Sequence, residues 1–231
     1  MSYDPNTQTR AMSLGTATSQ GNALSASSQR VLRNTYALLG LTLAFSAGVA
    51  GVSMSMGLPH PGMILTLIGF FGLSFLISKT ANSGLGVLAV FALTGFMGYT
   101  LGPLLTRTLD LPGGAGTIAA ALAATGATFV ALSAYVLTTR RDFSFMGGFL
   151  FAGMVIALVL GITAYAFSMP ALALAVSGMV ALLSVGLILF ETSRIVNGGE
   201  TNYVLATVGL FVSAFNLFTS LLSLFGIGGN D

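Results

Sequence analysis

This sequence has few side chains that could take part in catalysis or bind an ion, so each one that adjoins a long apolar run can be considered in turn. Glu191 is one of six acidic residues and closes an apolar run in the segment LFETSRI. A carboxylate at the edge of such a run could bind a cation or sense pH. Arg194 follows three residues later, which is the spacing of an ion pair on one helix. We favour the ion pair because Glu191 ends its run, and the cation site stays the alternative.

Enzymatic chemistry finds little support in the residue types. His60, the single histidine, stands in the polar break GLPHPG, which is typical of a turn. The chain has no cysteine, so disulfides and thiolate metal ligands are excluded. A retinal protein needs a lysine in the middle of a span, whereas Lys79, the one lysine, ends an apolar run. An intramembrane enzyme is therefore the least favoured class, and we expect no catalytic residue, cofactor or metal.

The composition indicates which solvent surrounds these side chains. Hydrophobic residues make up 55% of the chain and charged residues 6%, whereas soluble domains carry about 25% charged residues. So few charges cannot cover a surface that faces water, and lipid is the solvent that such a chain requires. The net charge of +2 is too small to indicate binding to nucleic acid.

Seven apolar runs are long enough to cross a membrane, which takes about 20 helical residues. Polar breaks rich in Gly, Pro and Asn separate them. The sequence therefore predicts an all-α, polytopic membrane protein with a bundle of seven transmembrane helices within residues 34–226. The expected spans are residues 35–56, 63–78, 84–105, 116–137, 145–167, 170–191 and 203–225.

The two flanks and the basic residues predict an orientation. Residues 1–33 are rich in Ser, Thr, Gln, Asn and Gly, so we expect a disordered cytoplasmic tail, with a short periplasmic end at residues 227–231. Alternating spans put seven of the eight basic residues on the side of the tail, and cytoplasmic loops carry that excess. An even number of spans, with the last run re-entrant, is the alternative. The expected topology anchors are Arg30, Arg33, Lys79, Arg140, Arg141 and Arg194.

Small and polar residues recur at helical spacing and predict which helix faces turn into the bundle. Serine hydroxyls in such stripes usually donate to carbonyls of their own helix, so we expect that of these serines. Asn216 is different, because its amide can either bond a neighbouring helix or belong to a site. The predicted stripes are Gly95, Gly98 and Gly102; Ala120, Ala124 and Thr128; Ser177, Ser184 and Glu191; and Ala206, Gly209, Ser213, Asn216, Ser220 and Ser223.

Four segments between about Arg30 and Gly226 resemble the Bax-inhibitor-1 family. They are VLRNTYALLGLTLAFSA, KTANSGLGVLAVFALTGFMGYTLGPLL, SAYVLTTRRDFSFMGG and LFETSRIVNGGETNYVLATVGLFVSAFNLFTSLLSLFG. The resemblance implies a seven-helix protein of the bacterial inner membrane with a cytoplasmic N-terminus. It also implies partners: the membrane-anchored, ATP-dependent protease FtsH and its associated proteins HflK and HflC. The chain would be a substrate and modulator of FtsH. Since such a protease must grip an unfolded segment, we expect residues 1–33, which are long and polar, to serve as the handle, with an inert flexible end as the alternative.

Some members of this family leak calcium in a pH-dependent way through two carboxylates, one near the end of the sixth span and one in the seventh. Glu191 matches the first position, and Ser213 stands at the second in place of an acid. The resemblance therefore makes a calcium leak doubtful here. A pH-sensitive calcium or cation leak channel stays the alternative function, with Glu191, Ser213 and Asn216 as the candidate ion or pH site.

Overall fold

The structure, a computed structural model, describes residues 26–228, with side chains to residue 226. These residues form seven long helices and a short 3-10 turn, without a strand, and each long helix is long and apolar enough to cross a membrane. The predicted all-α bundle with seven spans is confirmed. In chain order the elements are α2 (Ala26–Ser55), α3 (Met63–Thr80), α4 (Gly84–Leu109), α5 (Gly114–Thr139), η1 (Ser144–Met146), α6 (Gly147–Ala166), α7 (Pro170–Val196) and α8 (Tyr203–Gly228).

The first helix begins earlier than its apolar run. It starts at Ala26 and not near residue 35, because Val31 and Leu32 pack against the buried cluster that contains Ile195 and Phe211. Residues 26–33 therefore belong to α2 and not to the tail. The rest of the expected tail, residues 1–25, and the last three residues lie outside the described part of the chain.

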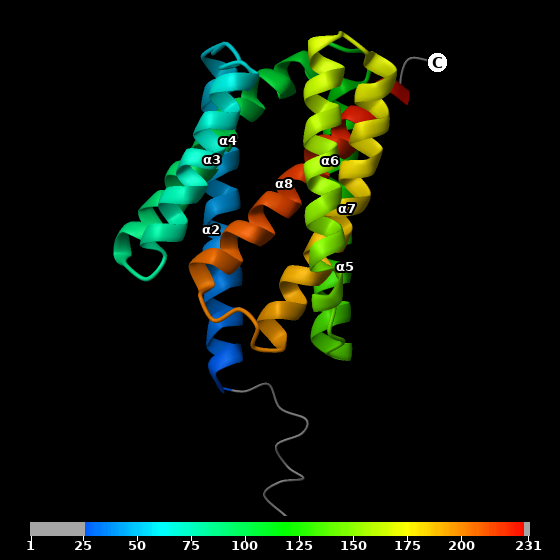
Figure 1. Cartoon of the computed structure of the whole chain (residues 1–231). Helices are drawn as coiled ribbons and strands as arrows, with labels where there is room; N and C mark the ends of the chain where they lie inside the picture. Colours follow the sequence, from blue (N-terminus) through cyan, green and yellow to red (C-terminus); the bar gives the residue numbers. More distant parts are fainter. Residues whose placement is uncertain (1–25, 229–231) are drawn as a thin grey trace, which may run out of the picture.

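The last helix, α8, is the central one. It packs against α2, α3, α4, α5 and α7 (Figure 1). Its predicted inward stripe is confirmed at Ala206, Ser213 and Ser220, which are buried. The opposite face is buried as well, because Leu210 and Leu217 also meet neighbouring helices. The sequence pattern therefore identified one buried face of a helix that is surrounded by others.

Three glycines let α4 pack closely on α2. A Cβ added at Gly98 would overlap the backbone carbonyl oxygen of Ser46, and one at Gly102 would overlap the side chain of Ser53. A Cβ at Gly95 would come 2.9 Å from the Phe45 ring. The first predicted stripe is therefore confirmed as a helix–helix contact, which at Gly98 and Gly102 leaves no room for a Cβ.

The stripe predicted for the fourth span is shifted by one residue. Ala120 is exposed, whereas Ala121 is fully buried and Thr125 lies beside it on the buried face. The reason is the position of α8, whose Phe218 and Leu222 pack against Ala121. The even distribution of small residues along α5 gives no sign of which face meets that helix.

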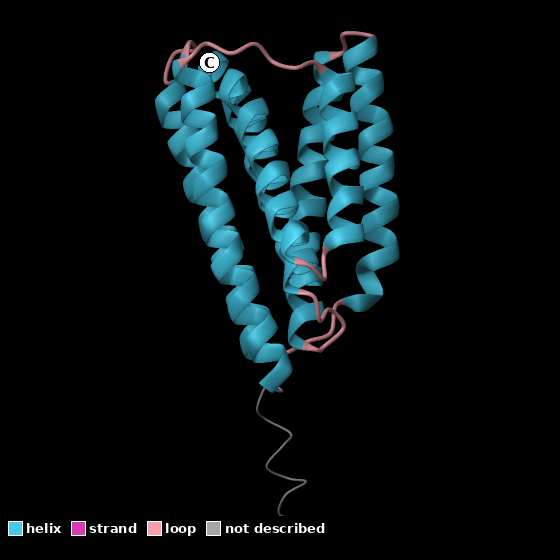
Figure 2. Cartoon of the chain, turned by 90° about the vertical axis from the view of Figure 1, so that its left-hand side faces the viewer, coloured by secondary structure: helices cyan, strands magenta, loops and turns pink. Residues whose placement is uncertain are grey.

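The described basic residues lie mostly at one end of the bundle. Six of them lie where α2 begins, and we call this the basic end; Arg107 lies toward the opposite end of α4. The loops gather toward the two ends in Figure 2, and Figure 1 shows α8 running from the loop after α7 toward the opposite end. This arrangement agrees with seven full crossings and not with a re-entrant last run. The six residues are Arg30, Arg33, Lys79, Arg140, Arg141 and Arg194.

We expect reporters fused to the two ends of the chain to be on opposite sides of the membrane. Because cytoplasmic loops carry the excess of basic residues, the basic end should face the cytoplasm. Alkaline phosphatase after Asp231 should be active, and a green fluorescent protein before Met1 should fluoresce. Fluorescence from a reporter placed after Asp231 would contradict this topology.

We expect Gly98→Ala to lower the free energy of unfolding by about 2 kcal/mol, because the added methyl group forces α4 away from α2. Gly126 is the matched control, since it is exposed on α5 and a Cβ there meets no atom within 4 Å. Gly126→Ala should leave stability unchanged or raise it by up to about 1 kcal/mol. Unfolding by sodium dodecyl sulfate in mixed micelles measures both. Equal unfolding midpoints for Gly98→Ala and Gly126→Ala would show that the contact between α4 and α2 has room for a methyl group at Gly98.

Candidate functional site

Glu191 lies between α7 and α8, five residues before the end of α7. Its side chain is 15% exposed. The carboxylate lies against the backbone of Gly209, where an added Cβ would come 2.8 Å from the carboxyl carbon of Glu191. A residue with a side chain at this point of α8 would therefore displace the carboxylate.

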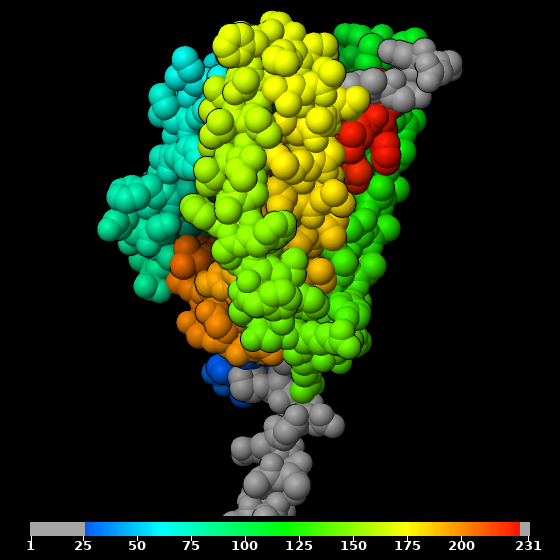
Figure 3. Space-filling view, turned by 45° about the vertical axis from the view of Figure 1, so that its right-hand side comes forward, coloured from blue at the N-terminus to red at the C-terminus, as the bar shows by residue number. Residues whose placement is uncertain are grey.

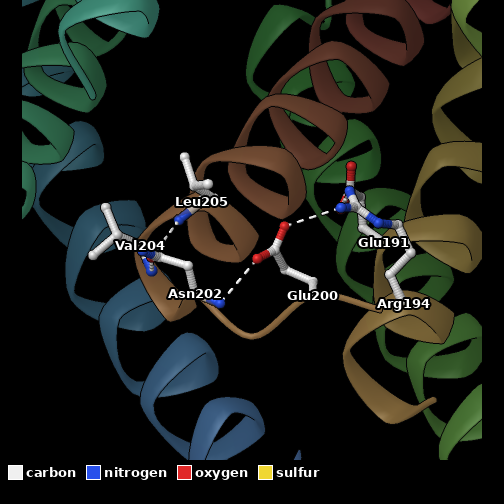
Figure 4. Close-up of polar contacts among 6 residues, drawn as sticks. All are labelled: Glu191, Arg194, Glu200, Asn202, Val204 and Leu205. Atoms are coloured by element: carbon white, nitrogen blue, oxygen red, sulfur yellow. Dashed lines mark hydrogen bonds and ion pairs between the residues drawn. The ribbon is translucent and has the colours of Figure 1, made fainter. Parts of the chain in front are cut away.

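Arg194 binds two carboxylates at once. Its Nη1 lies 3.5 Å from Oε2 of Glu191, and its Nη2 lies 3.0 Å from Oε2 of Glu200 (Figure 4). The guanidinium also lies over the Phe190 ring, 5.5 Å from the ring centroid. The predicted pair of Glu191 and Arg194 is confirmed. The sequence analysis did not identify Glu200. Its position six residues after Arg194, in the polar break between two apolar runs, was the signal that could have indicated this second ion pair.

Glu200 also shapes the loop between α7 and α8. Its backbone N–H donates to the carbonyl of Arg194 at 3.0 Å, which turns the chain back. Its Oε1 accepts the backbone N–H of Asn202 at 2.9 Å. Both oxygens of this carboxylate therefore hold the loop that leads into α8.

Asn202 caps α8 and fastens it to the turn between α3 and α4. Its Oδ1 accepts the N–H groups of Val204, at 2.9 Å, and Leu205, at 3.3 Å (Figure 4). Such N-cap bonds satisfy donors that the helix itself leaves free. Its Nδ2 donates to Asn82 Oδ1 at 2.8 Å and to the Ala81 carbonyl at 3.2 Å. We call Glu191, Arg194, Glu200, Asn202 and Asn82 the Arg194 network.

Ser193 fastens the loop between α5 and α6 to the same end of α7. Its buried Oγ accepts the N–H of Phe143 at 2.9 Å and donates to Asp142 Oδ1 at 3.4 Å. Asp142 also accepts a hydrogen bond from Ser144, which lowers the pKa of the Asp142 carboxyl below its usual value. The last turns of α7 therefore hold loops from both halves of the chain.

The other predicted site residues divide between two places. Ser213 donates to the carbonyl of Gly209 at 2.8 Å, so it lies one turn along α8 from the contact with Glu191. This bond back to its own helix was predicted, and Ser177 makes the same kind of bond. At Ser184 the prediction is wrong, because its buried hydroxyl has no hydrogen-bond partner among the described residues. Asn216 lies elsewhere, in the lining of an apolar cavity, and its amide bonds no neighbouring helix among the described residues. The structure therefore brings Glu191 and Ser213 to one helix contact and separates Asn216 from it.

This arrangement suits charge neutralisation at a membrane boundary better than cation binding. Both carboxylates already face the guanidinium of Arg194. The part of the chain that the structure describes has no group of three or more acidic, His or Cys residues placed to hold a metal. His60 lies at the opposite end, where its Nδ1 accepts the N–H of Gly62 at 3.0 Å in a turn, as predicted.

Removal of the shared cation should harm the protein more than removal of either anion. We expect Arg194→Met to lower the free energy of unfolding by about 2 kcal/mol, because two partly buried carboxylates then lack a partner. Glu191→Gln should lower it by less than about 1 kcal/mol, since Arg194 keeps Glu200. Unfolding in mixed micelles measures all variants. Addition of Glu191→Gln and Glu200→Gln to Arg194→Met should recover most of the loss, and no recovery would contradict the shared charge.

Comparison with known proteins places this architecture in a family. The model of the family described as "Inhibitor of apoptosis-promoting Bax1" matches residues 28–230. A protein of Escherichia coli K12 named modulator of FtsH protease YccA is 54% identical over 206 residues, which are 89% of this chain and 93% of the relative. An uncharacterized protein of Pseudomonas aeruginosa is 53% identical over 87% of this chain and 90% of its own length. A membrane protein of Vibrio cholerae is 44% identical over 87% and 91%. With these matches, the chain belongs to the Bax-inhibitor-1 family.

Proposed function

We propose that this protein modulates a membrane-anchored, ATP-dependent protease of the FtsH type, as an inhibitor that the protease also degrades. The observation that carries the proposal is the 54% identity to the E. coli modulator of FtsH over 93% of that relative. Identity at this level along nearly the whole relative supports a common role in addition to a common fold. HflK and HflC, which associate with FtsH, are the further partners that we propose.

The N-terminal residues supply the segment that such a protease would grip. An ATP-driven protease pulls on chain outside the folded bundle, and residues 1–25 precede α2 at the basic end. A stretch of this length reaches at most on the order of 80 Å when extended. Residues 1–25 also lie outside the match to the family model, which begins at residue 28. We propose that the basic end is cytoplasmic and that degradation starts from this tail.

Capture of the protease from membranes tests the proposal. Tagged wild-type protein, solubilised in mild detergent, should retain the FtsH-type protease, and deletion of residues 2–24 should not prevent it, because the helices remain. The deletion stops there because Ser28 is already buried in the first turns of α2. The deletion should lengthen the half-life in a pulse-chase experiment at least about two-fold. A variant with residues 2–24 replaced by a Gly/Ser sequence of equal length separates tail length from tail sequence.

Two outcomes would count against separate parts of this proposal. Wild-type protein that retains no protease under conditions that preserve the protease complex would overturn the modulator role. Equal half-lives for the wild type and the deletion would leave that role intact and reject the tail as the starting point of degradation.

A cation leak is the second candidate function, and the position of Glu191 between α7 and α8 is the observation that favours it. Ser213 lies one turn from the contact that Glu191 makes with Gly209. Calcium is bound by several oxygen ligands, usually carboxylates, and Arg194 already neutralises the one carboxylate present at this contact. We therefore regard the leak as the weaker candidate.

We expect wild-type protein in liposomes to pass little calcium at any pH between 5 and 8. Ser213→Asp should raise calcium entry, reported by an enclosed dye, because it adds a second carboxylate beside Glu191. Ser213→Asn is the uncharged control and should match the wild type. A strong leak from the wild type that Glu191→Gln abolishes would show that one carboxylate suffices.

A further inference from the structure

An apolar groove opens sideways between α3 and α6. Among the described helices α6 packs against α7 alone, and no residue of α3 has its Cα within 8 Å of a Cα in α6. The space between them has a volume of about 500 Å³ and is lined by residues of α3, α4, α6, α7 and α8. Figure 1 shows α8 between the pair α3 and α4 and the pair α6 and α7, and Figure 3 shows α6 on the outside. We call this space the lateral groove.

Asn216 differs from the threonines in the lining of the lateral groove, because its side-chain amide makes no hydrogen bond with any described residue. The groove's two threonines already have partners: Thr66 donates to the carbonyl of Gly62, the N-cap of α3, and Thr100 to that of Met97 in its own helix, each at 2.8 Å. Asn216 lies 13 residues after Tyr203, which is about 20 Å along the helix and near its middle. A free amide at this depth is costly in hydrocarbon, because lipid tails offer neither a donor nor an acceptor.

We propose that the lateral groove receives a transmembrane helix of the protease partner, and that this helix presents a hydrogen-bonding side chain to Asn216. This inference rests on the proposed function, which supplies a membrane-anchored partner. Amide side chains promote the association of helices in membranes through bonds of this kind. An acyl chain could fill the apolar volume but would leave the amide without a partner.

The shape of the groove favours a helix. The lining residues extend from Met63 to Phe71 on α3 and from Phe151 to Ile162 on α6. These lengths correspond to about 12 Å and about 16 Å, or two to three helical turns. Phe71 and Phe151 are 53% and 72% exposed and stand on the two walls, where they can pack against an incoming helix.

A second copy of this chain fits the groove less well. The partly exposed hydroxyls on its α6 and α7, Thr163 and Ser177, already donate to carbonyls of their own helices. The hydroxyl of Tyr165 is exposed and bonds no described residue, but it stands one residue before the end of α6. Neither helix therefore brings a free donor to the depth of Asn216, which lies near the middle of α8. A partner helix with its own amide or hydroxyl group remains the occupant that matches the chemistry of the groove.

Photo-crosslinking in living cells tests the occupant. Benzoylphenylalanine in place of Phe71 or Phe151 should form adducts with the protease. The same residue in place of Leu41 on α2 or Leu122 on α5 should not, although both leucines are exposed, at 61% and 57%, and neither lines the groove. Adducts only with lipid or with a second copy would overturn the assignment, whether or not the wild type captures the protease.

Two pairs of variants test the contact itself. Gly161 lines the groove, and a Cβ there meets a single atom, at 3.9 Å, so Gly161→Phe can fill the space. Gly161→Phe and Asn216→Leu should each lower the amount of captured protease at least about five-fold, in line with loss of one interhelical contact. Gly126→Phe on α5 and Asn216→Gln should keep at least half of it.

These variants distinguish a failure of the groove proposal from a failure of the proposed function. Unfolding midpoints within the range of the wild type show that a variant with reduced capture is folded. If the wild type, Gly161→Phe and Asn216→Leu all capture the protease equally, the groove is not the binding site. The proposed function is then unaffected. Loss of capture in the two control variants as well would also overturn the groove as the specific site.

Discussion

The basic end of this protein depends on one ionic interaction, in which the guanidinium of Arg194 pairs with both Glu191 and Glu200. Few charges are present, and lipid surrounds most of the surface, so each partly buried charge needs a partner nearby. The same arginine and Glu200 set the path of the loop after α7, and that loop delivers Asn202 to the start of α8. From there the bonds to Asn82 and Ala81 reach the turn between α3 and α4. One ion triad thus positions the end of α7, the start of α8 and the turn between α3 and α4.

The remainder of the bundle is held by apolar packing around α8. Close contact through Gly98 and Gly102 fixes α4 on α2, and Ala121 of α5 packs on the far part of α8. In contrast, α3 and α6 contribute few buried residues and stand at the periphery. The groove between them is consistent with a role for these two helices in partner binding more than in stability.

The seven spans were predictable because length, hydropathy and polar breaks are local properties. The predicted starts of α3, α4, α7 and α8 agree with the structure. The pair of Glu191 and Arg194 was predictable for the same reason, since three residues on a helix bring side chains together. Glu200 was missed although its partners Arg194 and Asn202 lie within six residues of it, because a loop has no fixed period that brings side chains together. The buried face of α5 and the free amide of Asn216 were not predictable, because each depends on how α8 packs against distant segments. Resemblance to the family supplied the proposed protease partner, which no pattern of residues indicates.

The charges around Arg194 hold the turn between α3 and α4 through Asn202, although Arg194 and Asn82 are far apart in the sequence. Hydrogen exchange followed by mass spectrometry, on wild type and Arg194→Met in lipid nanodiscs, tests this directly. In the variant we expect faster exchange in peptides that cover residues 80–86 and the first turn of α8, with unchanged exchange in the loop between α4 and α5. Exchange at residues 80–86 that equals the wild type, while the loop after α7 loses protection, would contradict it.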